Sequence, residues 1–273
     1  MKRIARITII ILLIGVFCLS GFKLFQMSGG YIQESLVKDK VAAYRPDAKE
    51  TQEAQAFVAQ NAYPHETEMI ELVEPQDNHP IEPDSPVVSL AINQNIVDMQ
   101  NEINTDVAGW LTIPGTHIDY PFVSTTDNDF YIGIDLYGNN STAGTIFADQ
   151  RCAADLSDFN LVLYGHNMRN NSMFGDLPLY SDVWFFENNR TGTLFLEYGT
   201  YALDIFAAMV IRSDDEIIYD PDADSEAFFG YVMENARNYR EPASHDRVAT
   251  LSTCGYEFNS ARIVVVAALT LMQ

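Results

Sequence analysis

Lysine is absent from most of this chain: all five lysines of the 273 residues lie before residue 50. Arginine is the only strong base beyond that point. In total, 16 Lys and Arg stand against 38 Asp and Glu, which gives a formal net charge of -22 at pH 7. A field of this sign repels nucleic-acid phosphates. We therefore expect no nucleic acid among the partners of this protein.

Cysteine is also scarce, with Cys18, Cys152 and Cys254 far apart in the chain. Three scattered cysteines supply neither a disulfide framework nor a four-thiolate metal site, so at least one thiol should be free. The five histidines contain no pair at a spacing typical of metal ligands. We therefore predict no metal and no other cofactor, and we interpret Cys152 as an incidental thiol.

Charged side chains are missing from residues 7–22, and the apolar stretch continues through Lys23 to Phe25. Three basic residues precede it: Lys2, Arg3 and Arg6. A membrane-spanning helix needs about 20 apolar residues, and the long side chain of Lys23 can reach the interface. Because basic residues favour the cytoplasmic side, we predict that residues 1–25 are a signal anchor. The protein would then be a single-pass cell-membrane protein whose remaining chain is extracytoplasmic.

Two alternatives to this uncleaved anchor remain open. Cys18 and Ser20 are small enough for the cleavage site of a signal peptide, which would be removed from the mature protein. A lipid-modified Cys18 fits less well, because the bulky Phe17 stands where a small residue is expected. In each case the rest of the chain is exported.

The segment after the predicted anchor, residues 26–85, is polar and acidic and contains scattered prolines. This composition is typical of a stalk or linker rather than of a folded unit. Residues 87–103 then place apolar side chains at roughly helical intervals, which predicts a helix that packs on a domain. We therefore assign residues 86–273 to one folded domain.

Short runs of β-branched and aromatic residues, bounded by Gly, Pro, Asn and Asp, predict eight strands in this domain and favour a barrel or a sandwich. The predicted strands are Gly109–Ile113, Ile118–Val123, Gly144–Ala148, Leu161–Tyr164, Thr193–Tyr198, Tyr201–Ile211, Val248–Thr253 and Ile263–Leu271. Gly199 predicts a tight hairpin between two of them. Asp224 or Ser225 can cap a helix that continues with apolar spacing to Tyr239.

Three residues that can carry chemistry stand at strand ends. Cys254 ends one predicted strand, and Arg262 opens the next, so that a hairpin would bring the two together. A cysteine is a useful nucleophile only as the thiolate, which a nearby positive charge or base favours. His166 follows the strand Leu161–Tyr164, and its imidazole is suited to proton exchange near neutral pH. Arg262 can donate several hydrogen bonds to an oxyanion without losing its charge.

The sequence around these residues resembles the sortases, and in particular their class B group. The nucleophile strand is represented by Thr250-Leu251-Ser252-Thr253-Cys254, and the arginine strand by the residues from Arg262 to Ala267. The resemblance extends from about Asn104 to Leu269 and includes Tyr164-Gly165-His166 upstream.

This resemblance implies a mainly β protein, with an eight-stranded sortase-type β-barrel, N-terminal helices and a helix before the cysteine strand. It also implies a cysteine transpeptidase that cleaves a C-terminal sorting signal. Cys254 would form a thioester, His166 would protonate the leaving amine, and Arg262 would stabilise the oxyanion or orient the substrate. The partners would be surface proteins bearing NPxTG-like or LPxTG-like signals, and the acceptor an amine of peptidoglycan or of a pilin.

Further substrate contacts are implied at Asn128, Ser252 and Thr253, although the last two could equally serve strand packing. The chain departs from some class B members in having Tyr256 where they carry an acidic residue. We therefore assign no acidic catalytic residue, and we interpret Glu257 as solvated.

Two other functions stay in competition. An exported cysteine hydrolase would release its product to water, although papain-like enzymes place the cysteine before the histidine and this chain does the reverse. A non-enzymatic barrel that binds a peptide would leave Cys254 no more reactive than an ordinary thiol.

Overall fold

The computed structural model describes Ser20, residues 31–46 and residues 92–272. Within the described residues, the side chains of strand β9 (Ala261–Leu271) alternate between two hydrophobic clusters. Ile263 and Val265 point into a cluster that receives side chains from eight strands, whereas Val264 and Val266 lie in a second cluster with helix α5 (Ser225–Asn235). A strand buried on both faces needs apolar residues at every position. This explains the continuous apolar run that follows Arg262.

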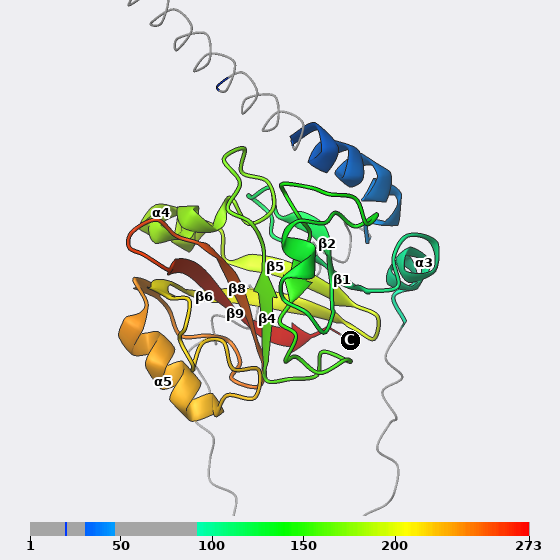
Figure 1. Cartoon of the computed structure of the whole chain (residues 1–273). Coiled ribbons are helices and arrows are strands. Elements are labelled where there is room, and N and C mark those ends of the chain that lie inside the picture. Colours follow the sequence, from blue (N-terminus) through cyan, green and yellow to red (C-terminus); the bar gives the residue numbers. More distant parts are fainter. Residues whose placement is uncertain (1–19, 21–30, 47–91, 273) are drawn as a thin grey trace, which may run out of the picture.

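Eight strands close into a barrel (Figure 1). Their order is β5 (Thr191–Leu196), β1 (Val107–Thr112), β2 (Asp119–Val123), β3 (Ile146–Ala148), β4 (Asn160–Tyr164), β8 (Val248–Cys254), β9 and β6 (Thr200–Arg212), which pairs back to β5. The pairs β2–β3 and β4–β8 are parallel, and the other pairs within the barrel are antiparallel. All eight predicted strands are present. Of the two predicted architectures, barrel and sandwich, the structure shows the barrel.

The predicted hairpin at Gly199 is confirmed, with this residue at φ +117°, a backbone angle that favours glycine. Its connection is longer than the predicted two residues. Strand β5 ends at Leu196 and β6 begins at Thr200, so three residues form the turn.

Helix α5 lies just before the cysteine strand, as predicted, but is shorter. The Asp224 carboxylate accepts a hydrogen bond of 2.9 Å from Ala227 N and caps the helix. Helix α5 ends at Asn235 because the next residues pair with β6: Arg237 N donates to Ala208 O, and the short strand β7 (Asn238–Tyr239) follows. This two-residue strand was predicted as part of the helix.

Helix α3 (Gln94–Glu102) lies within the predicted helix of residues 87–103, of which residues 87–91 lie outside the described residues. Its Ile96 and Met99 are fully buried against Trp110 of β1. The remaining short elements were not predicted: helix α4 (Val183–Asn188) and the 3-10 helices η1 (Ala42–Tyr44), η2 (Phe130–Ile132) and η3 (Leu177–Ser181).

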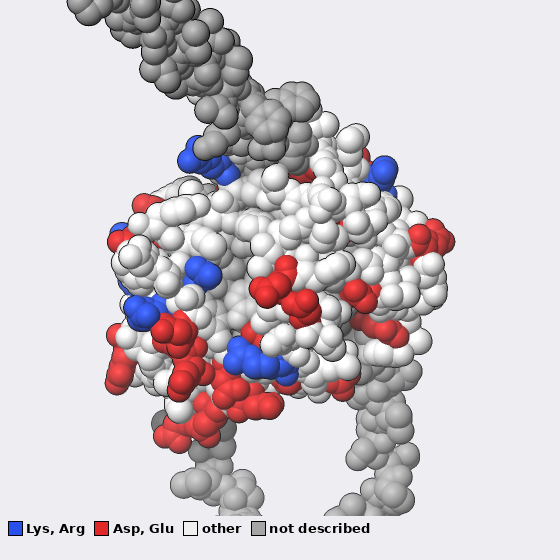
Figure 2. Space-filling view, viewed as in Figure 1, with Lys and Arg blue, Asp and Glu red and all other residues white. Residues whose placement is uncertain are grey.

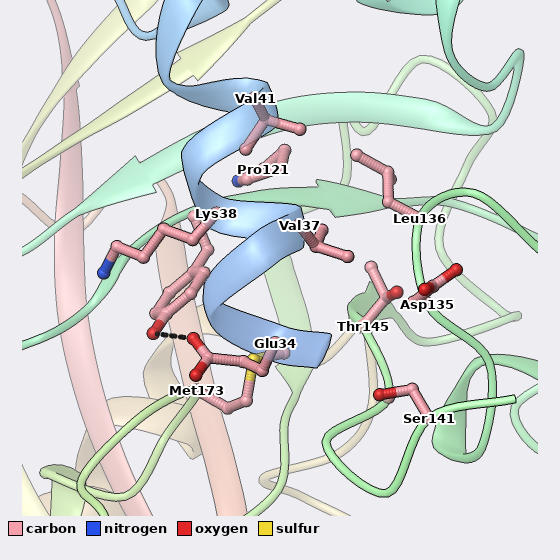
Figure 3. A pocket seen from close by; sticks show the side chains of 12 residues that line it. Glu34, Val37, Lys38, Val41, Pro121, Asp135, Leu136, Ser141, Thr145 and Met173 are labelled. Atoms are coloured by element: carbon pink, nitrogen blue, oxygen red, sulfur yellow. Dashed lines mark hydrogen bonds between the residues drawn. The ribbon is translucent and has the colours of Figure 1, made fainter. Parts of the chain in front are cut away.

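Residues 31–46 differ from the predicted linker, because residues 31–41 form a helix that packs on the barrel (Figure 3). Val37 and Val41, one turn apart, face the barrel, and Val41 is 1% exposed. Glu34 Oε1 accepts a hydrogen bond of 2.9 Å from the Tyr120 hydroxyl. This apolar pair is too short a pattern to stand out in a proline-containing, acidic segment. The rest of the predicted linker, residues 26–30 and 47–85, lies outside the described residues.

None of the helices among the described residues has the length and apolar character needed to cross a membrane. Apart from Ser20, the predicted anchor of residues 1–25 lies outside the described residues. Its assignment stays a prediction from the sequence.

Candidate active site

Cys254 and Arg262 occupy directly opposite positions on the antiparallel strands β8 and β9. Side chains of such a pair project from the same face of the sheet, with Cβ atoms roughly 5 Å apart. The connecting loop closes with a hydrogen bond of 2.9 Å from Gly255 N to Ala261 O. Cys254 is exposed and Arg262 is partly buried. The hairpin therefore brings the thiol and the guanidinium together, as the sequence predicted.

His166 reaches the same rim through the parallel pairing of β4 with β8, in which Tyr164 lies opposite Ser252. The next residues continue alongside the end of β8. Gly165 N donates to Ser252 O at 3.2 Å, and Asn167 Nδ2 donates to Cys254 O at 2.8 Å. His166, between them, is therefore held beside Cys254.

The imidazole of His166 has one defined partner among the described residues. Its Nε2 lies 2.8 Å from the carbonyl oxygen of Ile132 in η2. Because a carbonyl oxygen only accepts hydrogen bonds, Nε2 must carry a proton in this arrangement. The contact leaves Nδ1 as the ring nitrogen that can take up and release a second proton.

A pocket of about 320 Å³ joins these groups. Its lining includes all six residues that the sequence analysis named: Cys254, His166, Arg262, Asn128, Ser252 and Thr253. The structure thus assembles the predicted set in one concave site at the end of the barrel where β4 and β8 end and β9 begins.

The three residues predicted to contact substrate already hold structural partners. The Asn128 side-chain oxygen accepts a hydrogen bond of 2.8 Å from Gln150 N, and Thr253 Oγ1 donates to Gly165 O at 2.7 Å. Ser252 Oγ lies 2.9 Å from the Tyr219 hydroxyl. Each of these contacts fixes the shape of the pocket wall.

The other lining residues were not named as site residues in the sequence analysis; among them are Ile132, whose carbonyl oxygen contacts His166, and Tyr219, which lies between β6 and α5. Neither of these two stands at the end of a predicted strand, so no local pattern marks them. Glu257, interpreted as solvated, is exposed and accepts a hydrogen bond of 2.9 Å from Tyr256 N within its own loop.

Acidic side chains are unevenly distributed over the surface of the domain. Asp and Glu gather over the lower part of the face shown in Figure 2, around α5, whereas Lys and Arg form a few small patches. Within the part of the chain that the structure describes, no three His, Cys, Asp or Glu side chains are grouped so that they could hold a metal ion.

The two described thiols should differ sharply in reactivity. Cys152 is half-buried against the barrel core, and burial raises the pKa of its thiol to about 11. Its thiolate fraction at pH 8 is then on the order of 10⁻³. We expect iodoacetamide at pH 8 to modify the exposed Cys254 well before Cys152, as measured by peptide mass spectrometry over time. Faster modification of Cys152 in the folded chain would contradict this assignment.

A closed barrel with a thiol, an imidazole and a guanidinium at one rim defines a cysteine-based acyl-transfer enzyme. A family model described as the sortase domain matches residues 111–270. Sortase B of Listeria monocytogenes is 32% identical over 181 residues, which cover 64% of this chain and 73% of that protein. The chain therefore belongs to the sortase family, and it is a cysteine transpeptidase of the sortase B type.

Solved structures agree with this assignment. Sortase B of Clostridium perfringens is 34% identical with a TM-score of 0.58, and the match covers 64% of this chain and 98% of that one. A class B sortase of Streptococcus pyogenes involved in pilus biogenesis is 30% identical with a TM-score of 0.58, covering 64% of this chain and 97% of that one. The predicted family and the predicted eight-stranded barrel are confirmed.

Proposed function

We propose that this protein is a membrane-anchored, extracytoplasmic transpeptidase that cleaves a C-terminal sorting signal through a Cys254 thioester. The protein would transfer the cleaved chain to an amine of peptidoglycan or of a pilin subunit. The observation that carries the proposal is the convergence of Cys254, Arg262 and His166 at one pocket, from strands far apart in the sequence.

In the first half of the reaction, Cys254 Sγ attacks the carbonyl carbon of the Thr–Gly-type bond. The carbonyl oxygen gains negative charge, and the Arg262 guanidinium, opposite Cys254 in the sheet, donates hydrogen bonds to it. As the C–N bond breaks, a proton passes from His166 to the leaving amine. The product is a thioester between the sorted chain and Cys254.

In the second half, the acceptor amine attacks the thioester carbon and Cys254 leaves as the thiolate. His166 takes the proton that the amine loses. A thioester keeps enough of the original bond's free energy for aminolysis, so the exchange needs no nucleotide. The contact of His166 Nε2 with Ile132 O supports Nδ1 as the nitrogen that exchanges this proton.

Location and partners rest on the sequence and on relatives. The basic residues before an apolar stretch that extends to Phe25 support an N-terminal anchor with the domain outside the cytoplasm. The Streptococcus pyogenes relative involved in pilus biogenesis supports a pilin amine, and peptidoglycan amines are the acceptors expected of the family in general. Class B likeness favours an NPxTG-like over an LPxTG-like signal.

Product analysis tests this function. The purified full-length chain would be incubated with a panel of NPxTG-like and LPxTG-like peptides, with and without triglycine or a diamino acid. We expect a new peptide–amine product at the expense of the hydrolysed one. If added amine changes neither the products nor the rate for any cleaved peptide, the protein is a hydrolase and the proposal is wrong.

A further inference from the structure

A buried carboxylate contacts the pocket residue Tyr164 and takes no part in the proposed chemistry. Asp149, directly after β3, is 1% exposed. Its oxygens accept hydrogen bonds from the Tyr164 hydroxyl at 2.8 Å and from Arg151, through Nε at 2.9 Å, Nη2 at 2.8 Å and the backbone N at 2.9 Å. Burying a charge is costly unless it is paired and fully hydrogen-bonded, and Asp149 meets both conditions.

Arg151 extends this arrangement to a second lining residue of the pocket, Tyr219. The same Nη2 that contacts Asp149 also donates a hydrogen bond of 2.5 Å to the backbone carbonyl of Tyr219. Tyr219 belongs to the segment between β6 and α5, and its hydroxyl meets Ser252 Oγ on the cysteine strand at 2.9 Å. Arg151 thus connects the loop after β3 to a segment that touches the residue two positions before Cys254.

The two tyrosines held in this way form part of the pocket. Tyr164 and Tyr219 both line it, and their ring centroids are 5.8 Å apart. Phe147, another lining residue, lies 5.5 Å from the Tyr164 ring. Burial raises the pKa of Tyr219 to about 12, so its hydroxyl stays protonated and available to Ser252 at neutral pH. An aromatic surface of this kind contributes binding energy only if its rings are held in place.

We propose that Asp149 and Arg151 are positioning residues for substrate binding: they fix Tyr164 and Tyr219 as a rigid aromatic wall of the pocket. This inference rests on the proposed function, because the pocket is taken to bind the sorting signal. The pair touches neither Cys254 nor the rim of the site, so its loss weakens peptide binding and leaves the thiol chemistry in place.

Asp149 is suited to this task because its charge persists. Burial alone would raise the pKa of its carboxyl, but the hydrogen bonds from Arg151 and Tyr164 outweigh burial and hold that pKa below its ordinary value. The same carboxylate, through its hydrogen bonds, raises the pKa of Arg151, so the ion pair stays charged at the pH of any plausible assay. The wall is therefore held by ion-pair geometry that a neutral substitute does not reproduce.

The test compares Arg151→Ala, Arg151→Lys and Asp149→Asn in the full-length chain, with the peptide that the panel shows to be turned over fastest. Losing a charge-assisted hydrogen bond and the order it maintains should raise KM about tenfold in Arg151→Ala, with kcat nearly unchanged. The KM of Arg151→Lys should lie between the KM of the unaltered chain and that of Arg151→Ala. An ammonium cannot reach both Asp149 and the Tyr219 carbonyl as the planar guanidinium does.

A matched control separates positioning from general stability. Arg190 and Asp204 form a similar double contact, at 2.5 and 3.0 Å, with Asp204 1% exposed, but neither lines the pocket. Arg190→Ala should lower the melting temperature while leaving KM unchanged. Equal KM values in Arg151→Ala and Arg190→Ala, or a fall in kcat alone in Arg151→Ala, would overturn the inference.

Two additions keep the test decisive. If Arg151→Ala does not fold, Tyr219→Phe removes only the hydroxyl that reaches Ser252 and should raise KM in the same direction; an unchanged KM would count against the proposal. Peptide affinity measured in a Cys254→Ala background should fall with Arg151→Ala whatever the chemistry. That binding result tests the wall, whereas cleavage by Cys254→Ala alone would refute the proposed function.

Discussion

Replacing Cys254 with alanine should abolish both thioester formation and peptide cleavage. The side chain stands exposed at the end of β8, facing the pocket, and alanine offers no atom that can attack a carbonyl carbon. Removing the nucleophile of a covalent enzyme costs on the order of 10⁴-fold or more, because the other groups act only in concert with it. The loss should appear in kcat, while the peptide still binds. Intact-mass measurement after mixing with peptide would detect the acyl adduct in the unaltered chain and none in the variant.

Cys152→Ala is the matched control for this experiment. Its thiol is half-buried against the barrel core, with a pKa raised by burial, and it lies outside the lining of the catalytic pocket. The variant should keep the cleavage rate and form the adduct normally. Cleavage that survives in Cys254→Ala and disappears in Cys152→Ala would mean that Cys152, and not Cys254, is the nucleophile.

Most of the fold could be predicted from the pattern of apolar residues, because both faces of several strands are buried. In β9, alternate side chains enter the barrel interior and the cluster beneath α5, so every residue from Ile263 to Leu269 is apolar. A run of this kind, with β-branched residues, is visible without any knowledge of the partners. The candidate catalytic set could be predicted for a related reason: Cys254, Arg262 and His166 all lie at strand ends, whose positions the pattern locates.

The features that were not predicted from the sequence depend on long-range contacts. Tyr219 enters the pocket because Arg151 holds its carbonyl and Ser252 meets its hydroxyl, two contacts between segments far apart in sequence. The helix of residues 31–41 docks through Glu34 and Val41 onto β2 and the loop that follows η2, in a stretch whose prolines and charges predict a linker. Such contacts are set by how loops meet in space, and a single sequence contains no period or spacing that encodes them.

Arg262→Ala should lower kcat/KM by about 10²–10³-fold, the usual effect of removing a principal oxyanion donor. The guanidinium lies opposite Cys254 in the sheet, where it can meet the charge that develops on the substrate carbonyl oxygen. Arg262→Lys should recover only part of the rate. An ammonium supplies the charge but lacks the planar set of donors, and its shorter reach changes the angle at the oxygen. Steady-state rates over a range of peptide concentrations would measure both variants.

Arg212→Ala provides the comparison, because Arg212 lies on β6 opposite Ala261, the residue before Arg262. Its side chain is 63% exposed and pairs with the equally exposed Asp214. Such a surface pair contributes little, so its loss should leave kcat/KM within about twofold. Iodoacetamide modification of Cys254 should persist in both variants, which shows that the thiol is still accessible. Equal losses in Arg212→Ala and Arg262→Ala would mean that positive charge near the rim matters in general, and that Arg262 has no specific contact with the oxyanion.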